Sequence, residues 1–539
     1  MYILFRGRQE FSFSCAVFIV LLSAGIAGRY SNAADWTVNP SLAFIGTYLD
    51  NVTLAPPGDE ASDFVTEINP GISVSGDGSR FDFRFDYRMQ NLFYSNFSDA
   101  NTTNHELSTD ANAELMRDLL FIDFSGSYSQ VLIEPTGRVG VDNVSIGEDT
   151  TDQGIFSISP YILRRFGNAA HGEFRYTYDR VDYAGESAAD SQVNQVFANL
   201  SSSSFSRALA GGSPNDSVRQ MSSADELFQE PQEPQGQQTQ QEDSLRYLRR
   251  RLPVKTPSKP LQWSATYSLD QFDGEDGTSS RFEQALLDLT YIVGPNLALL
   301  AGLGYEDNDF DSQNEATQQP KGFAWNAGAA WSPIRHTVLE ARVGDRFFGN
   351  TYSFFLRHFT RRTNATIEYR EEFINPAGTA LENQDRPIAS LIETGPVPAC
   401  DQNGTISTPS PGVGNEVFFR KRLTVDLCKA TAKSAFVIGA YEENRDFQVS
   451  GDEEQVYGGS ISWDWRLSER TRSLIDMQWG RLIEEGGQQD DWDIGLQVTR
   501  QIRPDIEGAL EYRYLRRDAP GAEDDYEQNS IAASVRVRF

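Results

Sequence analysis

The feature that most constrains the fold of this chain is a strict alternation of apolar and charged side chains at residues 80–89. The apolar positions are Phe81, Phe83, Phe85, Tyr87 and Met89, and the charged positions are Arg80, Asp82, Arg84, Asp86 and Arg88. Successive side chains of a β-strand point to opposite faces of the sheet. The segment therefore predicts a strand with one apolar face and one fully charged face.

The same alternation recurs along the chain in segments of about ten residues, the length that a tilted strand needs to cross a bilayer. Further examples are Phe174/Tyr176/Tyr178, Leu297/Leu299/Ala301/Leu303/Tyr305, Trp492/Ile494/Leu496/Val498 and Leu510/Tyr512/Tyr514. A soluble β-sandwich also alternates, but in a membrane barrel the apolar face meets lipid and the polar face lines the lumen. The number, length and spacing of the segments favour the barrel. We predict an all-β fold, a transmembrane antiparallel up-and-down β-barrel of about 22 strands (roughly 20–22).

The connections between these segments alternate between short and long. Short ones are predicted at residues 76–79, 116–118, 167–168, 294–296, 332–333, 360–363, 468–470 and 503–505, and long ones at 51–62, 134–152, 273–280, 308–320, 375–415 and 516–527. The short set is rich in Gly, Pro, Asn and Asp, which suit tight turns. Bacterial barrels have short periplasmic turns and longer extracellular loops. We therefore expect the long acidic loops outside and both ends of the barrel chain on the periplasmic side.

Composition and the N-terminal residues indicate where the chain functions. The chain has 77 acidic and 47 basic residues, so its net charge is −30. A negative charge of this size repels the phosphates of nucleic acids. A mean hydropathy of −0.47 is too polar for a bundle of membrane helices. Residues 1–33 combine Arg6 and Arg8, an apolar run at 11–27 and a small-x-small site ending at Ala33, which together predict a signal peptide. We expect export to the outer membrane, among its lipids and lipopolysaccharide.

One stretch interrupts the barrel pattern. We assign 34–206 to the first part of the barrel, 207–260 to an insert and 261–539 to the rest of the barrel. The insert is rich in Gln, Glu and Pro, so it cannot bury a core and is expected to be disordered in the periplasm. Its basic run from Arg246 to Lys259 suits docking to a periplasmic partner or an anionic polymer; a solvated linker is the alternative.

The last strand carries a further signal. The residues that share its apolar face are Ile531, Ala533, Val535, Val537 and the terminal Phe539. This pattern is similar to the C-terminal signal by which outer-membrane barrels engage the barrel assembly machinery, so we expect that machinery as a partner. The alternative is an edge strand of a soluble β-domain.

Two cysteines remain after removal of the signal peptide, Cys400 in the long loop 375–415 and Cys428 in the strand that follows. The periplasm is oxidising. If the loop folds inward, a disulfide between Cys400 and Cys428 would tie it to the wall and narrow the pore; two free thiols are the alternative.

Charged residues on the inward-facing parity are candidates for lining the lumen. They are Glu173, Arg175, Asp179, Arg420, Arg422, Asp426, Glu507, Glu511 and Arg513. Mixed charges suit a hydrated pore for polar solutes, although any lumen wall is polar. Acidic loop residues are candidates for binding Ca²⁺ or for bridging to lipopolysaccharide through divalent cations, but no EF-hand spacing occurs and solvated loops are favoured. The four histidines lack a metal-binding spacing, and no GxSxG, P-loop or GxGxxG motif occurs in a suitable context. We expect no metal, no cofactor and no catalytic residues.

The N-terminal third resembles a known family. The matching segments are Asp35 to Leu42, Thr47 to Pro56, Ser62 to Gly71, Asp86 to Arg88 and Tyr94. They are similar to the uncharacterised outer-membrane β-barrel proteins associated with PEP-CTERM/exosortase systems. The resemblance spans about residues 36–182, and the insert at 207–260 departs from it. It implies a porin-like outer-membrane protein of Gram-negative bacteria whose genes accompany exopolysaccharide production and protein sorting.

These observations predict a passive outer-membrane channel or export conduit, with polysaccharide or oligosaccharide as cargo by family context only. One alternative is a non-conducting barrel that anchors or organises surface polysaccharide or a periplasmic partner. Another alternative is an outer-membrane hydrolase or transferase, but no sequence motif supports it. Barrels of this width tend to carry a plug.

Overall fold

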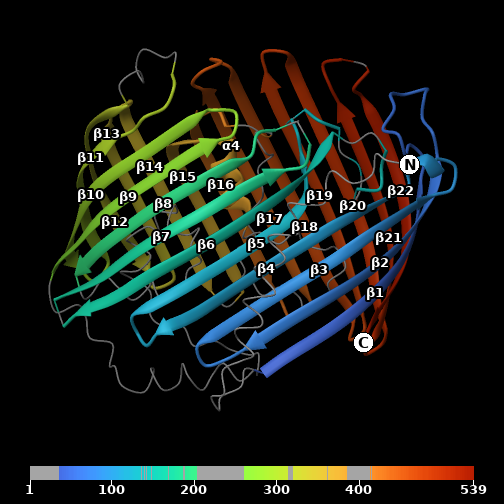
Figure 1. Ribbon diagram of the computed structural model, residues 1–539, viewed down its shortest axis with the longest axis horizontal. Coiled ribbons are helices and arrows are strands. Elements are labelled where there is room, and N and C mark those ends of the chain that lie inside the picture. Colours follow the sequence, from blue (N-terminus) through green and yellow to red (C-terminus); the bar gives the residue numbers. More distant parts are fainter. Residues whose placement is uncertain are drawn as a thin grey trace.

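The structure of this protein is a computed structural model that describes residues 35–202, 260–312, 320–384 and 413–539, apart from short gaps at 135, 139, 141–142, 147–148, 168, 186–187, 361, 414 and 522. The predicted signal peptide at 1–33 and residues 207–259 of the predicted insert lie outside the described residues. Figure 1 shows a single sheet whose tilted strands form a closed wall around a lumen.

The wall consists of 22 strands, most of them longer than the ten residues expected from the sequence. Their bounds are β1 (Asp35–Leu49), β2 (Asp63–Asp77), β3 (Phe81–Tyr94), β4 (Thr102–Met116), β5 (Leu120–Leu132), β6 (Thr150–Phe166), β7 (Ala170–Tyr183), β8 (Ser191–Ser202), β9 (Leu261–Gly274), β10 (Ser279–Gly294), β11 (Leu297–Asp307), β12 (Lys321–Ile334), β13 (Thr337–Arg346), β14 (Gly349–Thr360), β15 (Thr363–Ile374), β16 (Phe418–Ala430), β17 (Ser434–Phe447), β18 (Glu453–Ser468), β19 (Thr471–Glu484), β20 (Gly487–Arg503), β21 (Ile506–Asp518) and β22 (Tyr526–Arg538). The described helices are a 3-10 turn, η1 (Ser98–Ala100), and α4 (Pro376–Gln384).

Each strand pairs antiparallel with the next one along the chain, and the last strand pairs with the first. The closing register runs from Ser41↔Arg538 to Leu49↔Ser530. Closure leaves no open sheet edge, which a wall facing lipid requires because lipid cannot hydrogen-bond free backbone groups. The predicted fold class, a closed antiparallel up-and-down barrel of 22 strands, is confirmed.

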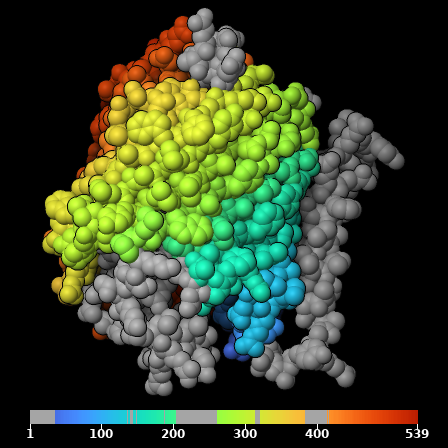
Figure 2. Space-filling view, turned by 90° about the vertical axis from the view of Figure 1, so that its left-hand side faces the viewer, coloured from blue at the N-terminus to red at the C-terminus, as the bar shows by residue number. Residues whose placement is uncertain are grey.

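The two faces of the wall differ as the alternation predicts. Outward side chains include Leu303, Phe323 and Leu510, which are 54%, 73% and 58% exposed. Figure 2 shows the side chains of one flank packed into a continuous outer surface. Large aromatic side chains are exposed near both ends of the strands, for example Trp36 at the start of β1 and Tyr48 near its end. This continuous apolar exterior, with aromatic residues at both borders, is the surface that a bilayer covers.

The two ends of the barrel carry different connections. At one end, here the turn end, β2–β3, β4–β5, β6–β7 and β20–β21 are joined by tight turns, in which Asp118 and Gly167 adopt positive φ values of 54° and 60°. Asp35 pairs with Asp77, beside the β2–β3 turn, and Arg538 donates its backbone N–H to the Asp505 carbonyl of the β20–β21 turn. The first and last strands therefore begin and end at the turn end.

The opposite end, here the loop end, carries most of the long connections, but the alternation is not strict. The β13–β14 connection contains only Phe347 and Phe348, and these rings pack against Phe373 and Phe419.

Several predicted boundaries also shift. At the turn end, β12 continues through Ser332 and Pro333 to Ile334, so the turn lies at 335–336 rather than 332–333. Proline is tolerated near the end of a strand at a position where no backbone N–H is needed for the sheet. Pro333 therefore did not mark the end of the strand.

In the described part of the chain, no helix is long and apolar enough to cross a membrane. The described residues also contain no separate plug domain. Within these residues, connections of the loop end enter the lumen.

Candidate functional site

The connection that follows β15 places a short helix, α4, inside the loop end of the barrel (Figure 1). Asn375 caps the helix, because its Oδ1 accepts the Gly378 N–H at 2.7 Å. Ala377 and Leu381 are buried in one apolar cluster with Val181, Val193 and Phe272 of strands β7, β8 and β9. The helix begins next to β15 and its apolar face packs on β7–β9, so it crosses part of the lumen from one stretch of wall to another.

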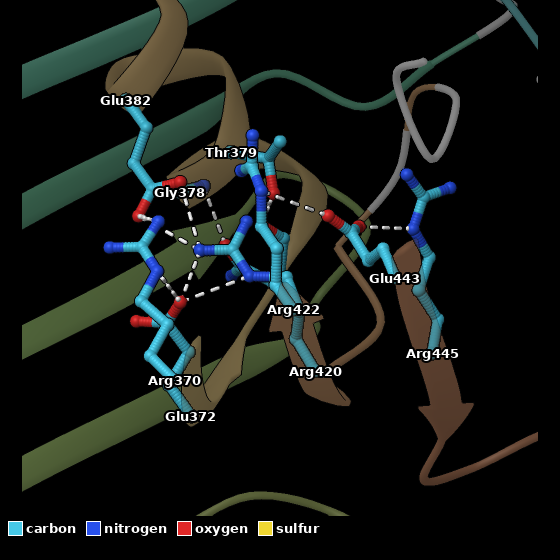
Figure 3. Close-up of polar contacts among 10 residues, drawn as sticks. Arg370, Glu372, Gly378, Thr379, Glu382, Arg420, Arg422, Glu443 and Arg445 are labelled. Carbon is cyan, nitrogen blue, oxygen red and sulfur yellow. Dashed lines mark hydrogen bonds and ion pairs between the residues drawn. The ribbon is translucent and has the colours of Figure 1, made fainter. Parts of the chain in front are cut away.

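The polar side of α4 meets a cluster that we name the arginine patch: Arg370 of β15, Arg420 and Arg422 of β16, and Arg445 of β17. Glu382 of α4 points into it (Figure 3), and its two carboxylate oxygens accept from Arg420 Nη2 at 3.0 and 2.9 Å. Arg420 Nε also donates to Glu372 at 3.0 Å. Charge-assisted pairs of this kind are about twice as strong as neutral hydrogen bonds. They fix the C-terminal half of α4 to the wall.

The remaining ion pairs of the arginine patch are unequal. Arg445 Nε lies 2.6 Å from Glu443 Oε1, and its Nη1 lies 3.0 Å from Glu454. Arg422 Nε lies 3.5 Å from the other Glu443 oxygen. Arg420 and Arg445 are 1% and 0% exposed in their side chains. Charges buried this deeply are stable only when paired, because leaving one unpaired costs several kcal/mol.

A second set of connections enters the lumen on another side. The Tyr94 hydroxyl donates to the Val144 carbonyl at 2.9 Å, and Gln528 Nε2 donates to Ser145 Oγ at 2.8 Å. Arg517 Nη1 donates to the carbonyls of Thr136 and Gly137, both at 2.7 Å. The β5–β6 connection is therefore attached to β3, β21 and β22, and it narrows the loop end from the side away from α4.

The residues just before β16 are attached to the β9–β10 turn and to β8. Asn415 Nδ2 donates to Asp276 at 3.4 Å, and Ser191 Oγ donates to Asn415 Oδ1 at 2.5 Å. Partial burial would raise the pKa of Asp276, but hydrogen bonds from Thr278 and Asn415 outweigh it and hold that pKa below its ordinary value. The carboxylate therefore stays ionised and keeps this attachment at neutral pH.

The structure places the nine predicted lumen residues on inward-facing positions of β7, β16 and β21. On β7, Arg175 is buried while Phe174 and Tyr176 are exposed on the outer face. Arg175 binds Asp123 at 2.8 Å and Glu173 at 3.1 Å, and its guanidinium lies 3.7 Å from the centre of the Tyr161 ring. The complete set is Glu173, Arg175, Asp179, Arg420, Arg422, Asp426, Glu507, Glu511 and Arg513.

These nine residues do not form one site. On β21, Arg513 binds Asp476 of β19 and Asp493 of β20 at 3.1 and 3.0 Å. Asp179 is fully buried beside the apolar cluster under α4. Only Arg420 and Arg422 belong to the arginine patch. Strand parity alone could have identified Arg370, Glu372, Glu443 and Arg445, whereas Glu382 lies in a loop without periodicity and had no sequence signal.

Cys428 is disulfide-bonded and sits on the inward parity of β16, opposite Asn364 of β15. Cys400 lies outside the described residues, so the pair Cys400–Cys428 stays a prediction. In the described part of the chain no group of three or more His, Cys, Asp or Glu residues could hold a metal ion.

The five residues of the predicted assembly signal lie on the outward parity of β22. Ile531 and Val535 are 54% and 43% exposed, and Phe539 is 73% exposed beyond the end of the strand. Val537 pairs with Leu42 of β1 and with Ile506 of β21. The complete set is Ile531, Ala533, Val535, Val537 and Phe539.

No family model matches the sequence, and no curated protein matches it. Among solved structures, the siderophore receptor PirA from Acinetobacter baumannii aligns with a TM-score of 0.46 and 10% identity over 95% of this chain and 81% of that one. The FrpB iron transporter from Neisseria meningitidis aligns with 0.45 and 8% over 96% and 84%. A loop-deletion variant of OmpT, an outer membrane protein of Vibrio cholerae, aligns with 0.30 and 8% over 94% and 100%. At these scores neither a ligand nor a mechanism transfers to this chain.

The wall and the loop-end contacts define the structural class of the protein without help from these comparisons. The protein is a β-barrel of the outer-membrane type, with an apolar exterior, a charged lumen and connections that fold into its loop end.

Proposed function

We propose that this protein is an outer-membrane channel that conducts polar solutes through its charged lumen, with α4 and the β5–β6 connection narrowing the loop end. The observation that carries the proposal is the contrast between the faces of one wall. Leu510 and Tyr512 are exposed outside, and Arg513 between two aspartates faces inside. Lumen walls of mixed charge are hydrated and suit polar cargo.

The resemblance at residues 36–182 supports a narrower proposal. The channel serves exopolysaccharide or oligosaccharide export in a PEP-CTERM/exosortase system of a Gram-negative bacterium. The signal peptide at 1–33 delivers the chain to the periplasm, and the barrel assembly machinery inserts it among outer-membrane lipids and lipopolysaccharide. The insert joins β8 to β9 at the turn end, which is the periplasmic end in this proposal, where a periplasmic partner would meet it.

A specific observation favours a second function. Two connections reach across the loop end, one through Glu382 and one through Arg517. A barrel narrowed in this way suits a non-conducting role, in which the protein anchors or organises surface polysaccharide or its periplasmic partner.

Single-channel conductance of the refolded mature protein in planar lipid bilayers separates the two functions. Ohmic steps are expected for the channel, and larger steps with reductant are expected if the Cys428 disulfide holds a constriction. Silence from protein whose gel mobility is heat-modifiable, and which is therefore folded, would contradict the channel and support the anchoring barrel.

A further inference from the structure

The arginine patch is arranged in two rows across β15–β17. In the row nearer the loop end, Glu372, Arg420 and Arg445 are register neighbours; in the next row, Arg370, Arg422 and Glu443 are. Neighbouring strands are about 4.8 Å apart, so Arg370 and Arg422 lie side by side and Arg420 lies one row above Arg422. Three guanidinium groups therefore border the position that the Glu382 carboxylate occupies.

The contacts of Glu382 are those of a bound carboxylate. Both of its oxygens accept from Arg420 Nη2, at 3.0 and 2.9 Å, and Arg370 Nη2 is 3.7 Å away. Glu382 enters from α4, whereas its partners all belong to the rigid wall (Figure 3). The wall groups stay in place by pairing with one another, because Arg420 and Arg370 both also contact Glu372. The wall therefore holds a preformed carboxylate site that α4 fills.

Among the described residues, Arg422 has the fewest polar contacts of the arginine patch. Its side chain is 6% exposed, and among the described residues it makes no hydrogen bond; its Nε and Arg420 Nη1 are buried without an acceptor. Its one ion pair within the described part of the chain, at 3.5 Å, is to Glu443, whose nearer partner is Arg445 at 2.6 Å. A guanidinium offers five N–H donors in a fixed plane. Donor capacity beyond the needs of Glu382 is thus available beside it.

We propose that the arginine patch binds the carboxylate of an anionic solute in the lumen, such as a uronate, and that Glu382 occupies this site as an internal competitor when the solute is absent. The inference rests on the proposed function, because it needs a solute in the lumen. Exchange of one carboxylate for another leaves the buried arginines paired with a carboxylate both before and after the exchange. The released Glu382 returns to water, and the solute gains the donors of Arg422.

The test is binding of D-glucuronate, with D-glucose as the neutral match, to the folded full-length barrel in detergent micelles by isothermal titration calorimetry. The variants are Glu382→Gln, Arg422→Gln and the control Arg281→Gln. Arg281 faces outward on β10 and pairs with Glu283 away from the lumen. Heat-modifiable gel mobility verifies the fold of each variant.

Glucuronate is expected to bind Glu382→Gln about tenfold more tightly than wild type, because the neutral amide competes less strongly than a carboxylate for the guanidinium donors. Arg422→Gln is expected to bind at least tenfold more weakly, and Arg281→Gln to match wild type. Equal binding of glucuronate and glucose to Glu382→Gln, or no effect of Arg422→Gln, would overturn the inference and leave Glu382 as a structural contact of α4.

Failure of this inference is distinguishable from failure of the proposed function. The binding readout needs no conductance, so a barrel that is silent in bilayers but prefers glucuronate retains the site while losing the channel. A conducting barrel without that preference retains the channel and loses the site.

Discussion

Leu381 controls how firmly α4 holds its position across the loop end. It is 4% exposed and packs on Val181, Val193 and Phe272. Truncation of a well-packed leucine to alanine costs about 2–5 kcal/mol. Because α4 is a single short helix whose docking depends on this contact and on Glu382, Leu381→Ala removes much of the free energy that holds it. At 1.4 kcal/mol per tenfold change, its undocked population should rise roughly 30-fold or more.

The assay is single-channel conductance in planar bilayers. Leu381→Ala is expected to show larger or more frequent open steps than wild type, because undocking of α4 widens the loop end. Leu482→Ala is the matched control, since Leu482 is an inward leucine, 7% exposed, in a separate cluster with Tyr441 and Val456. Its cavity is comparable, but it leaves α4 untouched.

Two results would refute this reasoning. If Leu381→Ala conducts as wild type does while remaining folded by gel mobility, α4 does not limit the pore. If Leu482→Ala opens the channel equally, the effect reflects general loosening of the barrel rather than release of the helix.

Three further predictions concern the wall, its last residue and its disulfide. Arg513→Met should lower barrel stability by about 3–5 kcal/mol because it leaves Asp476 and Asp493 without their cation, measured as the midpoint of heat-modifiable unfolding. The exposed, outward Arg516 is the control, and Arg516→Met should leave that midpoint nearly unchanged. Equal effects of the two substitutions would count against a paired lumen wall. Deletion of Phe539 should reduce the folded fraction in outer membranes, and Phe539→Tyr should restore it; undiminished assembly of the deletion would remove the C-terminal residue from the signal. Cys428→Ser should raise conductance as reductant is expected to do. Cys400→Ser should raise conductance equally and should also make the Cys428 thiol reactive toward an alkylating reagent. A Cys428 thiol that stays protected from alkylation in Cys400→Ser would exclude the predicted pair.

The sequence predicted what depends on local periodicity. Alternation such as Leu510, Glu511, Tyr512, Arg513 assigned the two faces of β21 without any knowledge of its neighbours, and glycine and aspartate marked turns that need positive φ, as at Gly167 and Asp118. These signals repeat in many of the strands, so the approximate strand number and the fold class followed from them.

Contacts between distant segments could not be predicted in this way. Glu382 meets Arg420 across 38 residues, and Arg513 meets Asp476 across 37. Such pairs depend on strand register, and register is set jointly by the stagger of the whole barrel and by its connections. The capping of α4 by Asn375 was local, but nothing in the pattern of the long loop indicated that its helix would turn inward.

The pairing of β22 with β1 implies an order of events during biogenesis. The wall is one continuous hydrogen-bonded ring, and the strands that close it, β1 and β22, are the two paired strands farthest apart in the chain. Until the final strand arrives, every partly formed sheet presents two unsatisfied edges that pair readily with other chains. Pairing of β22 with β1 therefore ends this exposure. An insertion catalyst that binds β22 would cover one open edge of the sheet until β1 pairs with it.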